Sequence, residues 1–135
     1  YFIQKKKQTL IICDIHNKKL KDGLHGLHVH KYGDLTKGCD STCEHYNPTN
    51  ENHGDRIGCP RHRGDLGNVQ ISNNACKDQF YADVNVYEII GRALIIHEGE
   101  DDLGLLDTES SKTTGSAGKR FDCGVIGICK NPQIK

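Results

Sequence analysis

Histidines are the residues of this sequence whose type and spacing could do chemistry. The chain has eight of them, and His28 and His30 stand two positions apart in the alternating run LHGLHVHK. Because side chains in a strand repeat every two residues, both imidazoles are expected to point the same way. Imidazole binds both copper and zinc, whereas a carboxylate suits zinc better than a soft metal. The candidate ligands are His28, His30, His45, His53, His62, Asp65 and His97.

Other interpretations stay open at this point. A histidine taken alone is more often a surface or hydrogen-bonded residue than a ligand, and His16 is interpreted in that way. A structural zinc site could also be built from Cys39, Cys43 and Cys59 together with histidines. The full set favours a metal site, because four of its seven members lie in a long loop, residues 33–68, that needs an anchor.

Two long polar segments must be held in place for such a site to form. Residues 33–68 show almost no periodicity and are rich in glycine, asparagine, aspartate and histidine. A loop of this length is usually functional, and ordering it costs about 1–2 kcal/mol per residue. We expect metal ligands and a disulfide to hold it. Residues 101–119 form a second such loop, with three leucines (Leu103, Leu105 and Leu106) as candidate anchors.

Short apolar or alternating runs predict the strands that position these loops. They lie at residues 9–15, 24–31, 81–87, 93–97 and 123–128. No segment keeps a helical period over three turns. The pattern predicts an all-β fold with short strands in one domain, residues 1–135, arranged as a Greek-key sandwich or barrel.

Composition limits the partners and the compartment. Lysine plus arginine and aspartate plus glutamate number 18 each, so nothing in the overall charge favours nucleic acid or an anionic membrane. We find no apolar stretch long enough to span a bilayer and no signal-peptide core. These features predict a cytoplasmic protein, in which most of the seven cysteines are free or metal-bound.

Seven motifs, in order, resemble the signatures of eukaryotic-type copper/zinc superoxide dismutases. The resemblance covers the chain from residue 1 to about 128. The motifs are GLHGLHVHKYGD at 23–34, GC at 38–39, HYNP at 45–48, HGD at 53–55, RHRGDLGN at 61–68, IIGRALIIHEGEDDLG at 89–104 and TGSAGKRFDCGVIGI at 114–128.

The resemblance implies a β-barrel fold with two long loops, in which one strand of the family is missing. The family has an eight-stranded Greek-key β-barrel, an immunoglobulin-like sandwich, with a disulfide and zinc loop at 33–68 and an electrostatic loop at 101–119. Tyr1 falls near the family's second strand, so the first strand is expected to be missing from this chain. Such a gap would expose backbone polar groups.

The resemblance also implies the roles of individual residues. His45 would bridge the two metals, and Asp101 would link His28 to His53 from outside the ligand set. His25 would be a structural histidine, and Cys39 and Cys123 would form a disulfide that the family keeps even in the cytosol. The copper ligands would be His28, His30, His45 and His97, and the zinc ligands His45, His53, His62 and Asp65.

The implied activity is the disproportionation of superoxide to dioxygen and hydrogen peroxide. Arg120 would orient the anion beside copper and Thr114 would flank the entrance, with Lys112 and Lys119 as candidate guides. A non-catalytic domain of the copper-chaperone kind remains an alternative. A copper-delivery protein and a second copy of the chain are the implied partners, and the dimer contact would use Tyr32, Ile90, Gly91, Val125 and Ile128.

The resemblance assigns no role to the remaining five cysteines. Cys43 and Cys59 lie in the long loop and either form a second disulfide or stay free. Cys13, Cys76 and Cys129 are interpreted as free thiols.

Overall fold

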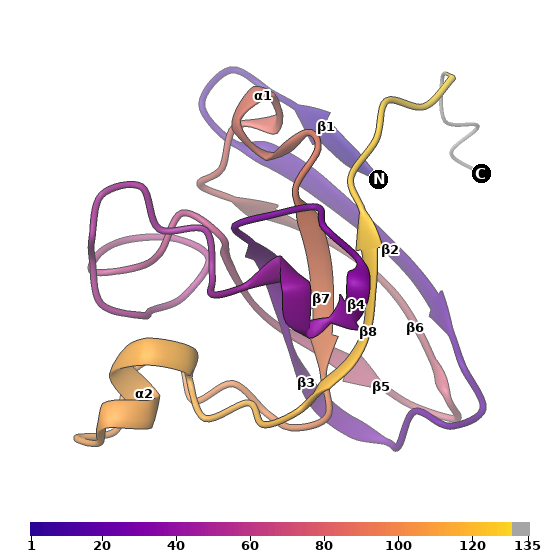
Figure 1. The fold of residues 1–135 in the computed structure, drawn as a ribbon. Helices are drawn as coiled ribbons and strands as arrows, with labels where there is room; N and C mark the ends of the chain where they lie inside the picture. The colour runs from indigo at the N-terminus through magenta and orange to yellow at the C-terminus, as the bar shows by residue number, and fades with distance from the viewer. Residues whose placement is uncertain (131–135) are drawn as a thin grey trace.

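Two antiparallel sheets form the body of the protein (Figure 1). The structure is a computed structural model and describes residues 1–130. The first sheet has the order β1-β2-β6, with β1 at Phe2–Gln4, β2 at Thr9–His16 and β6 at Ala75–Ala82. The second has the order β5-β3-β7-β8, with β5 at Asp65–Ile71, β3 at Gly23–His30, β7 at Ala93–His97 and β8 at Arg120–Val125.

The connections carry the remaining elements. The short strand β4 at Thr36–Cys39 lies outside both sheets and runs into a 3-10 turn at Asp40–Thr42. The helices α1 at Val86–Ile89 and α2 at Glu109–Thr114 are both short. None of the helices in residues 1–130 has the length and apolar character needed to cross a membrane.

The prediction of a strand at residues 81–87 is wrong beyond Ala82. The chain bends there and starts α1, because the side chain of Asn85 accepts a hydrogen bond from the Tyr87 N–H and so caps the helix. The strand β6 lies upstream instead, where it pairs with β2 from Thr9↔Ala82 to His16↔Ala75. Only the first two residues of YADVNVY, Tyr81 and Ala82, therefore belong to a strand.

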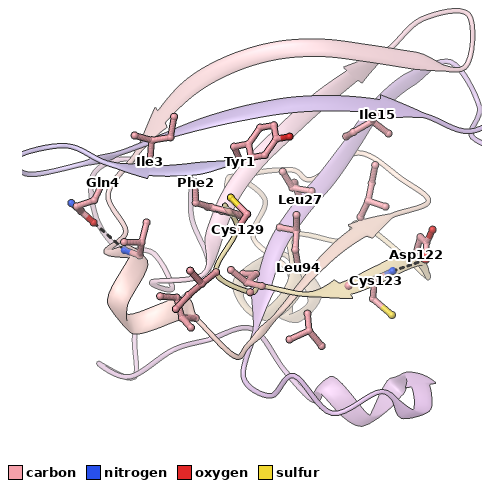
Figure 2. A pocket seen from close by; sticks show the side chains of 18 residues that line it. Tyr1, Phe2, Ile3, Gln4, Ile15, Leu27, Leu94, Asp122, Cys123 and Cys129 are labelled. Atoms are coloured by element: carbon pink, nitrogen blue, oxygen red, sulfur yellow. Dashed lines mark hydrogen bonds between the residues drawn. The ribbon is translucent and has the colours of Figure 1, made fainter. Parts of the chain in front are cut away.

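The described residues form two separate sheets that do not close into a barrel, and this arrangement agrees with the expected all-β, immunoglobulin-like sandwich. β1 bonds only to β2 and β8 only to β7, and β4 contributes to neither sheet. A groove of about 810 Å³ opens between these two free edges, and its wall includes Phe2, Leu27 and Val125 (Figure 2). An open sandwich of seven paired strands agrees with the expectation that one barrel strand is missing.

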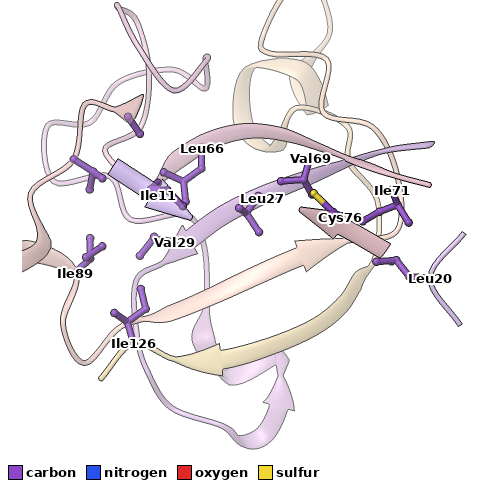
Figure 3. Packing of buried hydrophobic residues seen from close by; sticks show 12 residues of the cluster. Ile11, Leu20, Leu27, Val29, Leu66, Val69, Ile71, Cys76, Ile89 and Ile126 are labelled. Atoms are coloured by element: carbon purple, nitrogen blue, oxygen red, sulfur yellow. The ribbon is translucent and has the colours of Figure 1, made fainter. Parts of the chain in front are cut away.

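The hydrophobic core lies between the sheets and fixes β3 (Figure 3). Ile11 comes from the first sheet, and Leu27, Val29 and Val69 come from the second, each with at most 2% of its surface exposed. Burying one such side chain contributes about 1.5–3 kcal/mol. Since Leu27 and Val29 face this core, the alternating residues His28 and His30 face the opposite side of β3, as predicted.

Polar contacts help to hold the loop that contains α2. Leu105 and Leu106 are 80% and 55% exposed, so the prediction that leucines anchor this loop is wrong for these two, whereas Leu103 is partly buried. The Ser111 hydroxyl instead donates to the Asp102 carboxylate at 2.8 Å. Asn68 joins the main chain of Asp101 through two hydrogen bonds, one donated and one accepted, each 2.8 Å long.

Candidate metal centre

Four buried histidines converge from three parts of the chain. His28 and His30 come from β3, His45 from the long loop, and His97 from the end of β7. One ring nitrogen from each lies within 4.8 Å of the other three. We call these four residues the copper set, because they are the residues that the sequence resemblance implies as copper ligands.

The ring nitrogens that face inward have no hydrogen-bond partner among residues 1–130. They are Nδ1 of His28 and Nε2 of His30, His45 and His97. The opposite nitrogens are tied down: His30 Nδ1 lies 2.6 Å from the Cys43 carbonyl and His97 Nδ1 lies 2.9 Å from the Gly118 carbonyl. Because a carbonyl only accepts, these rings donate outward and turn a lone pair inward, which is what a metal ion needs.

A second cluster forms around one carboxylate oxygen. Oδ1 of Asp65 lies 3.1 Å from Nδ1 of His45, 3.0 Å from Nδ1 of His53 and 3.3 Å from Nδ1 of His62. Four ligands in a tetrahedron around zinc are about 3.3 Å apart at ordinary bond lengths. Three imidazoles and a carboxylate at these separations fit zinc, so we call these four residues the zinc set.

His45 is common to both clusters, with Nε2 toward the copper set and Nδ1 toward the zinc set. His28 also lies within 4.8 Å of the ligand atoms of His45, His53 and Asp65. We assign His62 and not His28 to the zinc set, because Nε2 of His28 is bonded to Asp101 and its Nδ1 faces the copper set.

Asp101 joins the two sets from outside. Its Oδ2 lies 2.6 Å from Nε2 of His28, and its Oδ1 lies 2.7 Å from Nε2 of His53. Gly115 leaves room for this contact: a Cβ there would lie 2.1 Å from Oδ1 of Asp101, and its φ of +69° also favours glycine. The side chain of Asp101 thus fixes one ring in each set.

His25 stands apart from both sets although it is buried. Its Nδ1 lies 2.7 Å from the His97 carbonyl and its Nε2 lies 2.8 Å from the Lys21 carbonyl. With both nitrogens occupied, this ring has none left for a metal. It ties β3 to the end of β7, which carries His97.

Burial prepares the copper set to bind metal as neutral imidazole. It lowers the pKa of His30 to about 2, with the neighbouring His45 adding to the effect. Burial also holds the pKa of His28 and of His45 well below the usual value. These rings therefore need not lose a proton before a metal binds.

The zinc set carries charge before any metal binds. Burial lowers the pKa of His53, but hydrogen bonds to Asp101 and Asp65 outweigh it and raise that pKa to about 9. Burial opposes ionisation of Asp65, yet its bonds to His45, His53 and His62 hold its pKa below the usual value. Zinc must therefore displace a proton from His53 at neutral pH, and uptake should weaken as the pH falls.

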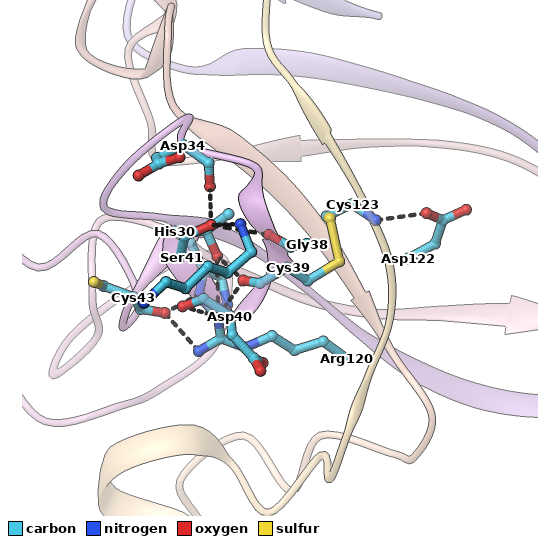
Figure 4. The surroundings of a disulfide bond; sticks show 12 residues. His30, Asp34, Gly38, Cys39, Asp40, Ser41, Cys43, Arg120, Asp122 and Cys123 are labelled. Carbon is cyan, nitrogen blue, oxygen red and sulfur yellow. Dashed lines mark hydrogen bonds between the residues drawn. A yellow bond between two sulfur atoms is a disulfide. The ribbon is translucent and has the colours of Figure 1, made fainter.

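Arg120 is fixed at the mouth of the copper set by the disulfide loop. The mouth is lined by His30, His45 and His97, and Thr114 and Arg120 also contribute to it. The guanidinium donates to the carbonyl of Cys39 and to that of Cys43, as Figure 4 shows. Lys112 and Lys119 do not line this mouth, and Lys112 is bonded to Asp107 instead.

The disulfide between Cys39 and Cys123 is present and joins the long loop to β8 (Figure 4). Cys43 and Cys59 are free thiols, as are Cys13, Cys76 and Cys129, so of the two alternatives left open for Cys43 and Cys59 the structure shows the free thiols. The candidate metal groups within residues 1–130 contain no cysteine. This composition argues against the alternative of a cysteine-bound structural zinc.

Arg61 is a positioning residue that the sequence reasoning missed. Its side chain is 7% exposed and donates to the carbonyls of Asp55, Asp83 and Asp65. These bonds hold the loop segment that carries His53 and His62 against β5. Only its place in the motif RHRGDLGN could have indicated it, because an arginine alone reads as a surface residue.

Comparison with known proteins agrees with this centre. The profile of the family described as copper/zinc superoxide dismutase matches residues 1–126. Superoxide dismutase (Cu-Zn) 2 of Mesembryanthemum crystallinum is 44% identical over 81% of this chain and 73% of its own. The copper chaperone for superoxide dismutase of Rattus norvegicus is 48% identical over 84% of this chain, which spans only 44% of that protein.

Similarity of structure extends over nearly the whole chain. The crystal structure of the clock protein EA4 superposes with a TM-score of 0.87 and 40% identity, covering 95% of this chain and 84% of that one. The family profile covers all of the ligand candidates, the disulfide cysteines and Arg120. On this evidence, the chain belongs to the copper/zinc superoxide dismutase family.

Proposed function

We propose that this chain disproportionates superoxide: two superoxide anions and two protons give dioxygen and hydrogen peroxide. Copper would be held by His28, His30, His45 and His97, and zinc by His45, His53, His62 and Asp65. When bound, copper supplies the one-electron chemistry by alternating between two oxidation states, which zinc cannot do. The observation that carries the proposal is the set of four inward, unpartnered ring nitrogens beside the mouth that Arg120 lines.

Arg120 would bind and orient the anion. Its charge is permanent, and its position is fixed by the carbonyls of Cys39 and Cys43 and by the Thr42 hydroxyl, 3.0 Å away. A fixed cation at the entrance raises the local concentration of a small anion even when the net charge of the protein is zero. Thr114 narrows the same mouth.

His45 would hold and release a proton at Nε2. This nitrogen is buried, lacks a hydrogen-bond partner among the described residues, and faces the copper set. The ring cannot turn away, because Nδ1 lies between Asp65 and His62 at 3.1 and 3.2 Å. A proton carried at Nε2 would be delivered beside the place where peroxide forms.

A non-catalytic, chaperone-like role is the second candidate, and the identity to copper chaperones favours it. Metal analysis and a superoxide consumption assay on the same sample separate the two. Copper and zinc together with rapid consumption support the enzyme. A metal-loaded sample that consumes no superoxide supports the chaperone-like domain.

The variant Arg120→Ala tests the proposed mechanism. We expect copper to stay bound while kcat/KM falls by about 10-fold or more, since the fixed charge at the mouth is lost. Lys119→Ala is the matched control: it removes the same charge from the neighbouring residue, which does not line the mouth. Equal rates for the two variants would contradict the role given to Arg120.

We also propose a homodimer in the cytoplasm, loaded by a copper-delivery protein. Tyr32, Ile90 and Val125 are 48%, 42% and 51% exposed, and Ile128 is 88% exposed. They belong to one region, because a Cβ on Gly33 would contact both the Gly91 carbonyl and Val125. Exposed apolar patches of this kind mark association sites.

Sedimentation tests the dimer. At micromolar concentration we expect twice the mass of one chain, and Val125→Asp should give a monomer that keeps its metals. The reason is that a charge would be buried without a partner at the interface. A wild-type monomer at that concentration would contradict the proposal.

A further inference from the structure

One acidic side chain lines the mouth of the copper set. The mouth has a volume of about 560 Å³, and of the described residues that line it only Arg120 and Glu44 carry a permanent charge at neutral pH. Superoxide is an anion, so a carboxylate at its entrance opposes the effect of Arg120. The proposed function gives Glu44 no role.

The position of Glu44 is built into the ligand scaffold. Glu44 directly precedes His45 and Lys31 directly follows His30, and the two histidines form an isolated β-bridge. The Lys31 N–H donates to the Glu44 carbonyl at 2.9 Å. The main chain therefore places the Glu44 side chain at the mouth and the Lys31 side chain beside Glu44, just outside the residues that line the mouth.

Lys31 neutralises this carboxylate. Its Nζ donates to Oε1 of Glu44 at 3.1 Å, and the two side chains are 45% and 66% exposed. An ion pair as exposed as this contributes little to stability. The pair matters instead for the electrostatic potential at the entrance, because the positive charge of Lys31 offsets the repulsion that Glu44 exerts on an approaching anion.

We propose that the Lys31–Glu44 pair sets the anion affinity of the mouth, with Glu44 opposing anions and Lys31 as its counter-charge. Lys31 and Glu44 belong to neither the copper set nor the zinc set, and their charged atoms bond to each other and not to a metal ligand. The expected effect on the rate of superoxide consumption rests on the proposed function, whereas the expected effect on anion binding does not.

The test compares four variants of the copper- and zinc-loaded protein. They are Glu44→Gln, Lys31→Met, the double variant, and the control Asp14→Asn, which makes the same charge change at a residue outside the mouth. Azide is the probe, and its dissociation constant is read from the visible absorption of copper(II). The second readout is kcat/KM for superoxide, and both are measured at low and high salt.

The expected changes have opposite signs. At low ionic strength Glu44→Gln should tighten azide binding and raise kcat/KM by about two-fold, the size of one unit charge acting through water at roughly 10 Å. Lys31→Met should weaken both by about the same factor. The double variant should return to the wild-type values, and at about 1 M salt all differences should vanish.

Three results would overturn the inference. They are a Glu44→Gln effect no larger than that of Asp14→Asn, a double variant that keeps the defect of Lys31→Met, and differences that persist in high salt. If azide affinity follows the expected order but no superoxide is consumed, the inference stands and the proposed function fails. If superoxide is consumed but azide affinity does not respond, the inference fails alone.

Discussion

Removing the disulfide by the double substitution Cys39→Ser and Cys123→Ser should lower the free energy of unfolding of the metal-free protein by about 4–5 kcal/mol. The two cysteines are 84 residues apart, so the bond closes most of the chain into one loop and restricts the unfolded state strongly. For a chain of this length the change corresponds to a fall of about 15 °C in Tm. Denaturant titration and calorimetry measure both quantities.

The same variant should also affect the mouth. Cys39 offers its carbonyl to Arg120 and to the Thr42 hydroxyl, so freeing the loop loosens the arginine. We expect kcat/KM to fall, but by less than in Arg120→Ala, because Cys43 still holds the guanidinium. Cys59→Ser is the control, since that thiol is free and exposed. If control and double variant unfold at the same denaturant concentration, the disulfide does not stabilise the fold.

The candidate ligands could be predicted from the sequence because their signals are local. The pair His28 and His30 sits on an alternating strand, and alternation fixes the face that each residue occupies. His45, His53 and His62 could be singled out because they lie in a long loop with no other source of order. What spacing could not supply is which nitrogen of each ring turns inward, since this depends on the carbonyls of Cys43 and Gly118.

Contacts between distant segments account for most of what the sequence did not predict. The loop before α2 is held by Asn68 and Asp102, and no pattern in the sequence distinguishes these polar residues from solvated ones. Arg61 was missed for the same reason. The strand expected at residues 81–87 failed because a single cap at Asn85 outweighs an alternating pattern.

The open groove between β1 and β8 follows from topology and not from local preference. Both strands have apolar residues that suit a barrel interior, such as Phe2 and Val125, yet within residues 1–130 each bonds to only one neighbouring strand. Strand preference alone cannot show which edges meet.

Replacing Asp65 should have the second large effect, on zinc content and on stability. Two substitutions separate its role as a zinc ligand from its role as a hydrogen-bond acceptor. Oδ1 completes the zinc set, while Oδ2 accepts hydrogen bonds from the main-chain N–H groups of Gly54 and His62 at 2.9 and 2.7 Å. Asp65→Ala removes both, so zinc should be lost and two buried donors left unpaired. Each such donor costs about 1–3 kcal/mol.

Asp65→Asn should lose zinc but keep the loop. Its amide oxygen can still accept from Gly54 and His62, while its NH2 group, turned toward His45 and His53, cannot bind a metal. In the metal-free protein the amide loses the charge-assisted bond to His53, so we expect the Asn variant to be less stable than wild type by about 1–3 kcal/mol. The Ala variant should be less stable than the Asn variant by about 2–6 kcal/mol, because it also leaves the Gly54 and His62 donors unpaired. Zinc content and denaturant titration measure the two effects.

Asp55→Ala is the matched control, since that carboxylate is exposed and lies outside both metal sets. It should keep its zinc and its stability. In all three variants copper should remain, because His28, His30 and His97 do not contact Asp65 through the nitrogens that face the copper set. If Asp65→Asn retained zinc, the carboxylate would not be a ligand. If Asp65→Ala proved as stable as Asp65→Asn, the hydrogen bonds to Oδ2 would not hold the loop.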